Sequence, residues 1–166
     1  MLGLPRAYDV DPAAVQRAFL QGAARIHPDL VAGGADPEAE GAAILNRAKR
    51  VLDDPEQRAI ALLRLLAPDG AVDERTLPPG FLAEMMDVRE QIEAAQTGRD
   101  RAALDRWERW AQEQRTSYRA AVGELFSAAA AAPDPGVFRR IRQTLNAWRY
   151  IERLIEQIDP DAAPRM

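Results

Sequence analysis

The sequence predicts an all-α protein in which a helical hairpin is followed by a three-helix antiparallel bundle. Apolar residues recur at steps of three and four along most of the chain, which is the spacing of one face of an α-helix. Proline and glycine clusters separate these segments, and no stretch shows the sustained alternation of a β-strand. One such cluster predicts a linker over residues 71–80, between a first domain at 1–70 and a bundle at 81–160.

The first half of the chain is predicted to contain three helices. Asp11-Pro12 is typical of an N-cap followed by proline in the first turn, and Pro28 ends this helix because it cannot continue the hydrogen-bond ladder. A second cap signal at Asp36-Pro37 starts a helix that ends near Pro55, where a third begins. The predicted buried stripes are, in order, Val15, Phe19, Gly22, Ala23 and Ile26; Ile44, Leu45, Ala48, Val51 and Leu52; and Ala59, Leu62, Leu63 and Leu66.

The second half is predicted to form three longer helices joined by short breaks at Thr97-Gly98 and around Pro133-Asp134-Pro135. Short connections favour antiparallel neighbours, so an up-down-up bundle buries all three stripes. The stripes are Phe81, Met85, Val88 and Ile92; Leu104, Trp107, Ala111, Gln114, Tyr118, Ala121 and Leu125; and Ile141, Leu145, Trp148, Ile151, Ile155 and Ile158.

The composition excludes several classes of function. Lysine and arginine number 22 against 26 aspartates and glutamates, so the chain lacks the basic excess that nucleic-acid binding requires. The chain has no cysteine, which excludes disulfides and any zinc ion or iron-sulfur cluster held by its own thiolates, and it has one histidine. We find no signal-peptide pattern and no membrane-spanning run, so we expect a cytoplasmic protein without cofactor, metal or membrane contact.

The most informative motif is His27-Pro28-Asp29, which follows the first predicted helix. It places an imidazole at the carboxyl end of a helix, a rigid ring in the bend and a carboxylate beyond it, so the turn suits recognition. A catalytic role is disfavoured because His27 has no second histidine or cysteine as a companion. Taken alone, the tripeptide fits a purely structural role better, in which His27 complements the helix end and Asp29 caps the next turn.

Nearly the whole chain resembles the HscB family of co-chaperones. The first half is similar to the family's J-domain in several segments, and the second half contains a match to the signature that opens the carboxyl-terminal bundle. These segments are Leu2-Gly3-Leu4-Pro5, Tyr8-Asp9-Val10-Asp11, Phe19, His27-Pro28-Asp29, Leu45-Asn46-Arg47-Ala48, Leu52-Asp53-Asp54-Pro55, Arg58-Ala59, Leu62-Leu63 and Phe81 to Glu90.

The resemblance implies two partners and no enzymatic activity of the chain itself. In the HscB family the J-domain turn stimulates ATP hydrolysis by a DnaK-type chaperone called HscA, and the other domain binds and delivers the iron-sulfur scaffold IscU. The resemblance assigns chaperone binding to His27, Pro28 and Asp29. Arg17 and Arg25 lie on one face of the first predicted helix and would add a thin basic docking face. It assigns scaffold binding to Leu82, Ala83, Met86, Asp87, Glu90 and Tyr150.

The spacing of the second set agrees with that assignment. Leu82 and Met86 are four residues apart and offset by one position from the predicted core stripe, so we expect them to add apolar surface outside the core. Asp87 and Glu90 would border this surface with negative charge and favour a partner that carries basic groups. The structural alternative is a wide buried stripe that includes both apolar residues, beside ordinary solvated carboxylates.

The sequence departs from the family pattern at several positions. Leu30 stands where a basic residue commonly follows the turn, and Ile26 replaces the aromatic residue before it. Lys49 stands where an aromatic is preferred, and Ala83 replaces a methionine of the scaffold patch. These departures leave room for an alternative, a J-protein that serves a general protein-folding chaperone. An enzyme of the helical-bundle type is disfavoured because no phosphate loop, metal-spaced ligand set or nucleophile motif is found.

Overall fold

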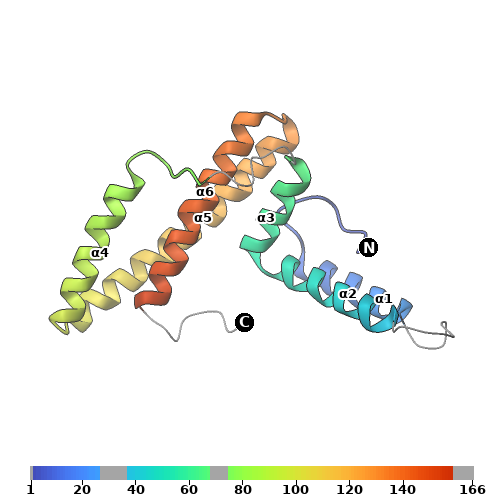
Figure 1. The fold of residues 1–166 in the computed structure, drawn as a ribbon, viewed down its shortest axis with the longest axis horizontal. Coiled ribbons are helices and arrows are strands. Elements are labelled where there is room, and N and C mark those ends of the chain that lie inside the picture. Colours follow the sequence, from blue (N-terminus) through green and yellow to red (C-terminus); the bar gives the residue numbers. More distant parts are fainter. Residues whose placement is uncertain (1, 27–36, 68–74, 159–166) are drawn as a thin grey trace. The chain divides into compact units, whose positions relative to one another are not determined.

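The computed structural model describes residues 2–26, 37–67 and 75–158, which form six α-helices and no β-strand. The helices are α1 (Pro12–Arg25), α2 (Pro37–Asp53), α3 (Pro55–Leu66), α4 (Phe81–Thr97), α5 (Arg101–Ala131) and α6 (Pro135–Ile158). The chain divides into two compact units, residues 1–66 with α1 to α3 and residues 67–166 with α4 to α6 (Figure 1). The predicted all-α fold class is confirmed. None of the helices described here combines the length and the apolar character that crossing a membrane requires.

Aspartate side chains begin four of the helices. Their carboxylates accept hydrogen bonds from free backbone N–H groups of the first turn, and three of the four are followed directly by proline, whose missing N–H costs nothing there. The four bonds are Ala13 N to Asp11 (2.9 Å), Glu56 N to Asp54 (2.8 Å), Ala103 N to Asp100 (2.9 Å) and Val137 N to Asp134 (3.1 Å). Each cap stabilises its helix by about 1 kcal/mol, and the predicted start at Asp11-Pro12 is confirmed.

In the first unit, α1 and α2 pack as an antiparallel hairpin. The side chain of Leu45 lies so close to Gly22 that a Cβ there would be 2.8 Å from Leu45 Cδ1. Further along the pair, a Cβ on Gly41 would be 3.4 Å from Ile26. The paired numbers run in opposite directions, which fixes the antiparallel register. Glycine lets the two backbones approach at both points.

The seam of this hairpin is narrower than the sequence predicts. Val15 and Leu45 are buried, but Ile44 is 41% exposed and Ala23 is also exposed, so their predicted places in the core are wrong. Each residue turns a helix by about 100°, and a single close-packed partner covers only a narrow strip of the helix surface. On the same hairpin, the Lys49 ammonium lies 5.8 Å from the centre of the Phe19 ring.

The amino-terminal segment is held to α3 by one arginine. Arg58 Nε donates a hydrogen bond to the backbone oxygen of Tyr8 (2.8 Å), and its guanidinium lies 5.3 Å from the centre of the buried Tyr8 ring. A second guanidinium nitrogen donates to the backbone oxygen of Leu52. Arg58 therefore connects the amino-terminal segment, the end of α2 and α3 through one side chain.

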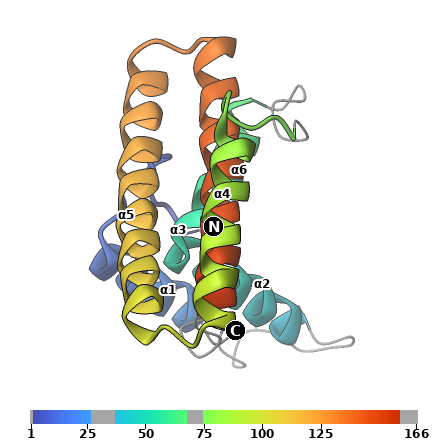
Figure 2. The same ribbon diagram turned by 90° about the vertical axis from the view of Figure 1, so that its left-hand side faces the viewer.

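In the second unit, α4, α5 and α6 form the predicted antiparallel three-helix bundle, and Figure 2 shows the three axes nearly parallel, with α4 in front of α6 and α5 beside them. At about 1.5 Å per residue, α4 is about 26 Å long, whereas α5 is about 46 Å and α6 about 36 Å. The longer pair continues beyond the end of α4 (Figure 2). The bundle therefore has three helices along only part of its length.

This difference in length explains why one predicted stripe is partly wrong. The prediction placed Ala121 and Leu125 in the core of α5, but the buried residues there are Val122 and Phe126, with exposed fractions of 0% and 4%. Ala121 and Leu125 are only half-buried. The part of α5 beside both other helices buries a wide face. Of the described helices in this unit, only α6 packs against the later part of α5, which turns a different strip toward it.

A hydrogen-bonded ion pair joins α5 to α6. Arg115 Nε lies 2.8 Å and 3.1 Å from the two carboxylate oxygens of Glu152, and another guanidinium nitrogen donates to the same carboxylate. Trp148 Nε1 donates a further bond of 2.6 Å to Glu152. Trp148 is buried, and Trp107 and Trp110 are half-buried against the core shared by α4, α5 and α6. The tryptophans are therefore part of the packing.

Candidate functional site

Helix α4 divides its apolar side chains between the core and the surface. Phe81, Met85, Val88 and Ile92 are buried, as predicted, in the core shared with α5 and α6. Leu82 and Met86 follow two of these residues by one position and are 53% and 64% exposed. Large apolar side chains that stay in water where a complete core already exists are typical of a surface that binds another protein.

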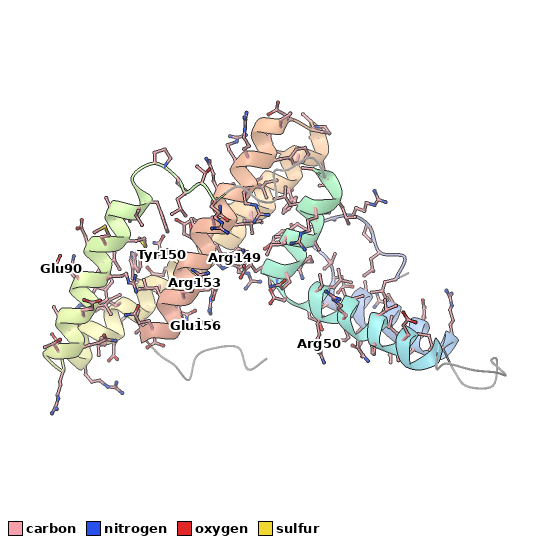
Figure 3. The ribbon with its side chains drawn as sticks, viewed as in Figure 1. Arg50, Glu90, Arg149, Tyr150, Arg153 and Glu156 are labelled. Carbon is pink, nitrogen blue, oxygen red and sulfur yellow. The ribbon has the colours of Figure 1, made fainter. Side chains whose placement is uncertain are left out.

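The exposed pair lies on the flank of α4 that faces α6. Arg89 is three residues after Met86 and seven after Leu82, so it shares their flank. Its guanidinium donates hydrogen bonds to Tyr150 Oη (3.4 Å) and to Gln157 Oε1 (3.3 Å), both on α6. Figure 3 shows Tyr150 between the two helices, on the side of α6 turned toward α4. The structure therefore brings Leu82, Met86 and Tyr150 to one surface, which we call the α4–α6 patch.

The ring of Tyr150 is supported from inside the core. It packs edge to face on Phe81, with ring centres 5.6 Å apart and an interplanar angle of 89°. Tyr118 of α5 also packs edge to face on Phe81, with ring centres 6.4 Å apart and an interplanar angle of 83°. Tyr150 is half-buried and packs against the core, so its ring is fixed while one side of it remains at the surface.

The three other predicted scaffold-binding residues lie on the outward side of α4. Ala83, Asp87 and Glu90 are exposed, and Figure 3 shows Glu90 on the side of α4 turned away from α6. They border the α4–α6 patch and do not fill its centre. Glu84 lies on the opposite flank, toward α5. Burial, and after it the negative charge of Glu84, raise the pKa of the Tyr118 hydroxyl above its ordinary value.

The chemical groups of the α4–α6 patch are suited to binding another protein. It offers an apolar centre, a phenol hydroxyl and charged borders, which can exclude water from a partner and fix its orientation. In the parts of the chain that the structure describes, no three His, Asp or Glu side chains are grouped so that they could hold a metal ion.

The structure describes only two of the residues predicted to bind a chaperone. Arg17 and Arg25 are exposed on α1, and Arg17 forms an ion pair of 3.4 Å with Asp11. His27, Pro28 and Asp29 lie outside the described residues, in the segment of chain between α1 and α2.

Sequence reasoning missed two arginines of the α4–α6 patch. Arg89 was assigned neither to the apolar pair nor to the acidic border. Its spacing of seven from Leu82 and three from Met86 indicates that it lies on their flank of the helix. Arg153 is exposed one turn after Tyr150 on α6. Because Arg153 follows Tyr150 by three residues, the sequence already indicated that the two lie next to each other on the helix surface.

Comparisons with known proteins agree with this architecture. The sequence profile of the HSCB C-terminal oligomerisation domain matches residues 77–159, the part of the chain that forms the bundle. A co-chaperone protein HscB homolog from Azoarcus sp. (strain BH72) is 30% identical over 166 residues, covering 96% of this chain and 89% of that protein. A second such homolog, from Burkholderia multivorans, is 31% identical and covers 93% of this chain and 87% of its own.

Two solved structures have the same fold. The human co-chaperone protein HscB matches with a TM-score of 0.76 at 23% identity, over 99% of this chain and 81% of that one. The chaperone HscB from Vibrio cholerae matches with a TM-score of 0.73 at 24% identity, over 96% and 93%. With the profile match over the bundle and identities of about 30% along almost the full length of the relatives, the chain belongs to the HscB co-chaperone family.

Proposed function

We propose that this protein stimulates ATP hydrolysis by a DnaK- or HscA-type chaperone and delivers to it an IscU-like iron-sulfur scaffold. In this proposal residues 1–70 are the J-domain and bind the chaperone through His27, Pro28 and Asp29. Residues 81–160 carry the scaffold on the α4–α6 patch, and residues 71–80 join the two. The chain is a co-chaperone and supplies no catalytic group of its own.

The observation that carries the scaffold half is the exposure of Leu82 and Met86 beside a fixed Tyr150. Burying two such side chains and a tyrosine edge supplies the apolar anchors that dominate interface energies. Phe81, Met85 and Ile92 already complete the core, so the fold does not require apolar residues at the two exposed positions.

The chaperone half is supported by the hairpin and by the motif that joins its two helices. The close Gly22 and Leu45 packing makes α1 and α2 a stiff pair, and the His-Pro-Asp sequence connects them in the chain. The exposed Arg25 offers positive charge for an acidic chaperone surface, whereas Arg17 already has Asp11 as a partner. A basic face this small predicts modest affinity for the chaperone.

A steady-state ATPase assay tests both halves. The HscA-type and the general DnaK-type chaperone of the same cell are each assayed with this protein and the scaffold, added separately and together. We expect this protein alone to raise the ATPase rate, and the scaffold to raise it further only when this protein is present. A response of the general chaperone alone would favour the adaptor alternative, and no response of either would contradict the proposal.

A further inference from the structure

The α4–α6 patch has borders of opposite charge on its two sides. On the outward side of α4 it is bordered by Asp87 and Glu90, both exposed. On the α6 side it is bordered by Arg153, which is exposed, and by Arg89. The apolar pair Leu82 and Met86 lies between these borders. If the partner were uniformly basic, the arginines on one edge of the patch would repel it.

The basic border is built on one ridge of α6. Tyr150, Arg153 and Gln157 are spaced by three and four residues and therefore follow one line along the helix surface. Arg89 of α4 hydrogen-bonds to the first and last of these residues, at 3.4 Å and 3.3 Å. Its guanidinium therefore lies against the ridge that carries Arg153, and the two positive charges share one edge of the patch.

Within the part of the chain that the structure describes, these charges have no ion-pair partner. Among the residues that the structure describes, Asp87, Glu90 and Arg153 form no ion pair. Arg89 donates hydrogen bonds to two neutral groups and forms no ion pair with a described residue, and a guanidinium has five donors. Both borders therefore have charge available for a partner.

We propose that the scaffold bound at this patch carries an acidic segment that lies along α6, opposite Arg89 and Arg153, and a basic segment opposite Asp87 and Glu90. This inference rests on the proposed function and adds the charge pattern of the partner. A partner with that pattern docks in one orientation, because the reversed orientation would bring like charges together on both borders. The apolar centre supplies affinity and the two borders supply direction.

The inference is tested by reversing the charge of Arg153. Binding of the IscU-like scaffold to the full chain is measured by isothermal titration at low and at physiological salt. We expect Arg153→Glu to weaken binding about tenfold at low salt and Arg153→Gln about threefold, with smaller effects at higher salt. Glu90→Lys is expected to weaken binding as well, because it reverses the other border.

Arg106→Glu is the matched control. Arg106 is an exposed arginine of α5, five residues before the fully buried Ala111 and so on the far side of its helix. Its reversal changes the net charge by the same amount, and we expect it to leave binding within about twofold. Circular dichroism of each variant checks that the helices remain, and Arg153→Gln keeps the test valid if Arg153→Glu disturbs α6 next to Glu152 and Glu156.

Whether Arg153→Glu weakens or tightens scaffold binding decides the inference. If the partner is uniformly basic, Arg153→Glu removes a repulsion and tightens binding, which would overturn the inference, as would an effect no larger than that of Arg106→Glu. Leu82→Ala with Met86→Ala is titrated alongside. If that pair also leaves binding unchanged, or the wild-type chain does not bind the scaffold, the proposed scaffold site itself is wrong.

A second copy of the chain is the other candidate occupant, because opposite borders complement each other across a two-fold axis. The matching profile is described as that of an oligomerisation domain. Light scattering on the free chain distinguishes the two occupants. A dimer that dissociates on Arg153→Glu would assign the charged borders to self-association and overturn the inference.

Discussion

Tyr150 meets Phe81 edge to face, with ring centres 5.6 Å apart and an interplanar angle of 89°. Phe81 is 5% exposed, whereas Tyr150 reaches the surface beside Leu82 and Met86. A buried ring thus supports a ring at the surface. The shape of the α4–α6 patch therefore depends on a residue that a partner would not touch.

Replacing that buried ring should affect both stability and binding. We expect Phe81→Ala to lower the free energy of unfolding of the second unit by about 3–5 kcal/mol, because it leaves a cavity beneath two tyrosines. Phe81→Leu should cost less and still weaken scaffold binding several-fold, because Tyr150 loses its edge-to-face partner. Urea unfolding followed by tryptophan fluorescence reports this unit selectively, since all three tryptophans lie in it. Unchanged binding by Phe81→Leu would show that Tyr150 needs no support from the core.

Truncating the exposed pair should separate binding from stability. Leu82→Ala with Met86→Ala is expected to weaken scaffold binding by about 2 kcal/mol or more, as loss of central interface anchors does. Both side chains are more than half exposed, so the free energy of unfolding should change by less than about 0.5 kcal/mol per site. Leu20→Ala, at a 56% exposed leucine of α1, is the control and should leave scaffold binding unchanged. Full binding by the double variant in titration calorimetry would relocate the site.

The raised pKa of Tyr118 predicts a loss of stability in alkaline solution. Burial, and then Glu84, make this phenol harder to ionise in the folded state than in the unfolded chain. Its contribution is therefore fully present below its unfolded pKa near 10 and is lost as the pH rises through the higher folded pKa. We expect wild-type stability to fall more steeply than that of Tyr118→Phe above about pH 10, measured by urea unfolding at a series of pH values. Glu84→Gln should give an intermediate slope, and parallel curves for all three proteins would contradict this prediction.

The Glu152 carboxylate should contribute more than a surface ion pair. It accepts hydrogen bonds from Arg115 and Trp148 in a half-buried position, so Glu152→Gln is expected to lower the free energy of unfolding by about 1–2 kcal/mol. The control is Arg17→Gln, which breaks the exposed pair with Asp11 and should cost less than about 0.5 kcal/mol. Both values come from urea unfolding, followed by fluorescence for the first and by circular dichroism for the second. Equal costs would mean that the bonds to Glu152 add no net stability.

Much of the fold could be predicted because the helix boundaries are local. Asp11-Pro12 and Pro55 mark helix starts through backbone chemistry that involves only neighbouring residues, and both starts agree with the structure. The predicted buried stripe of α4 was also correct, because this short helix buries the same side along its whole length.

The errors arose where burial depends on a distant partner. Whether Ala121 or Val122 faces the core is decided by where α4 begins, at Phe81 beside Tyr118. Whether Ile44 is covered is decided by the width of the α1–α2 seam. The site shows the same division. Spacing offset Leu82 and Met86 from the core stripe, and the family resemblance favoured their exposure over a wider buried stripe. The contact of Arg89 with Tyr150 depends on which side of α6 faces α4, and no periodicity within either helix determines that.

The central claim is that one chain links an ATP-driven chaperone to a scaffold, and a mixing experiment tests it most directly. His27→Gln is expected to retain its helicity and abolish ATPase stimulation, whereas Leu82→Ala with Met86→Ala should keep basal stimulation and lose the further increase that the scaffold produces. Because the link requires both sites on the same molecule, an equimolar mixture of the two variants should not restore that increase in the steady-state ATPase rate. Restoration of the full wild-type increase by the mixture would contradict the account.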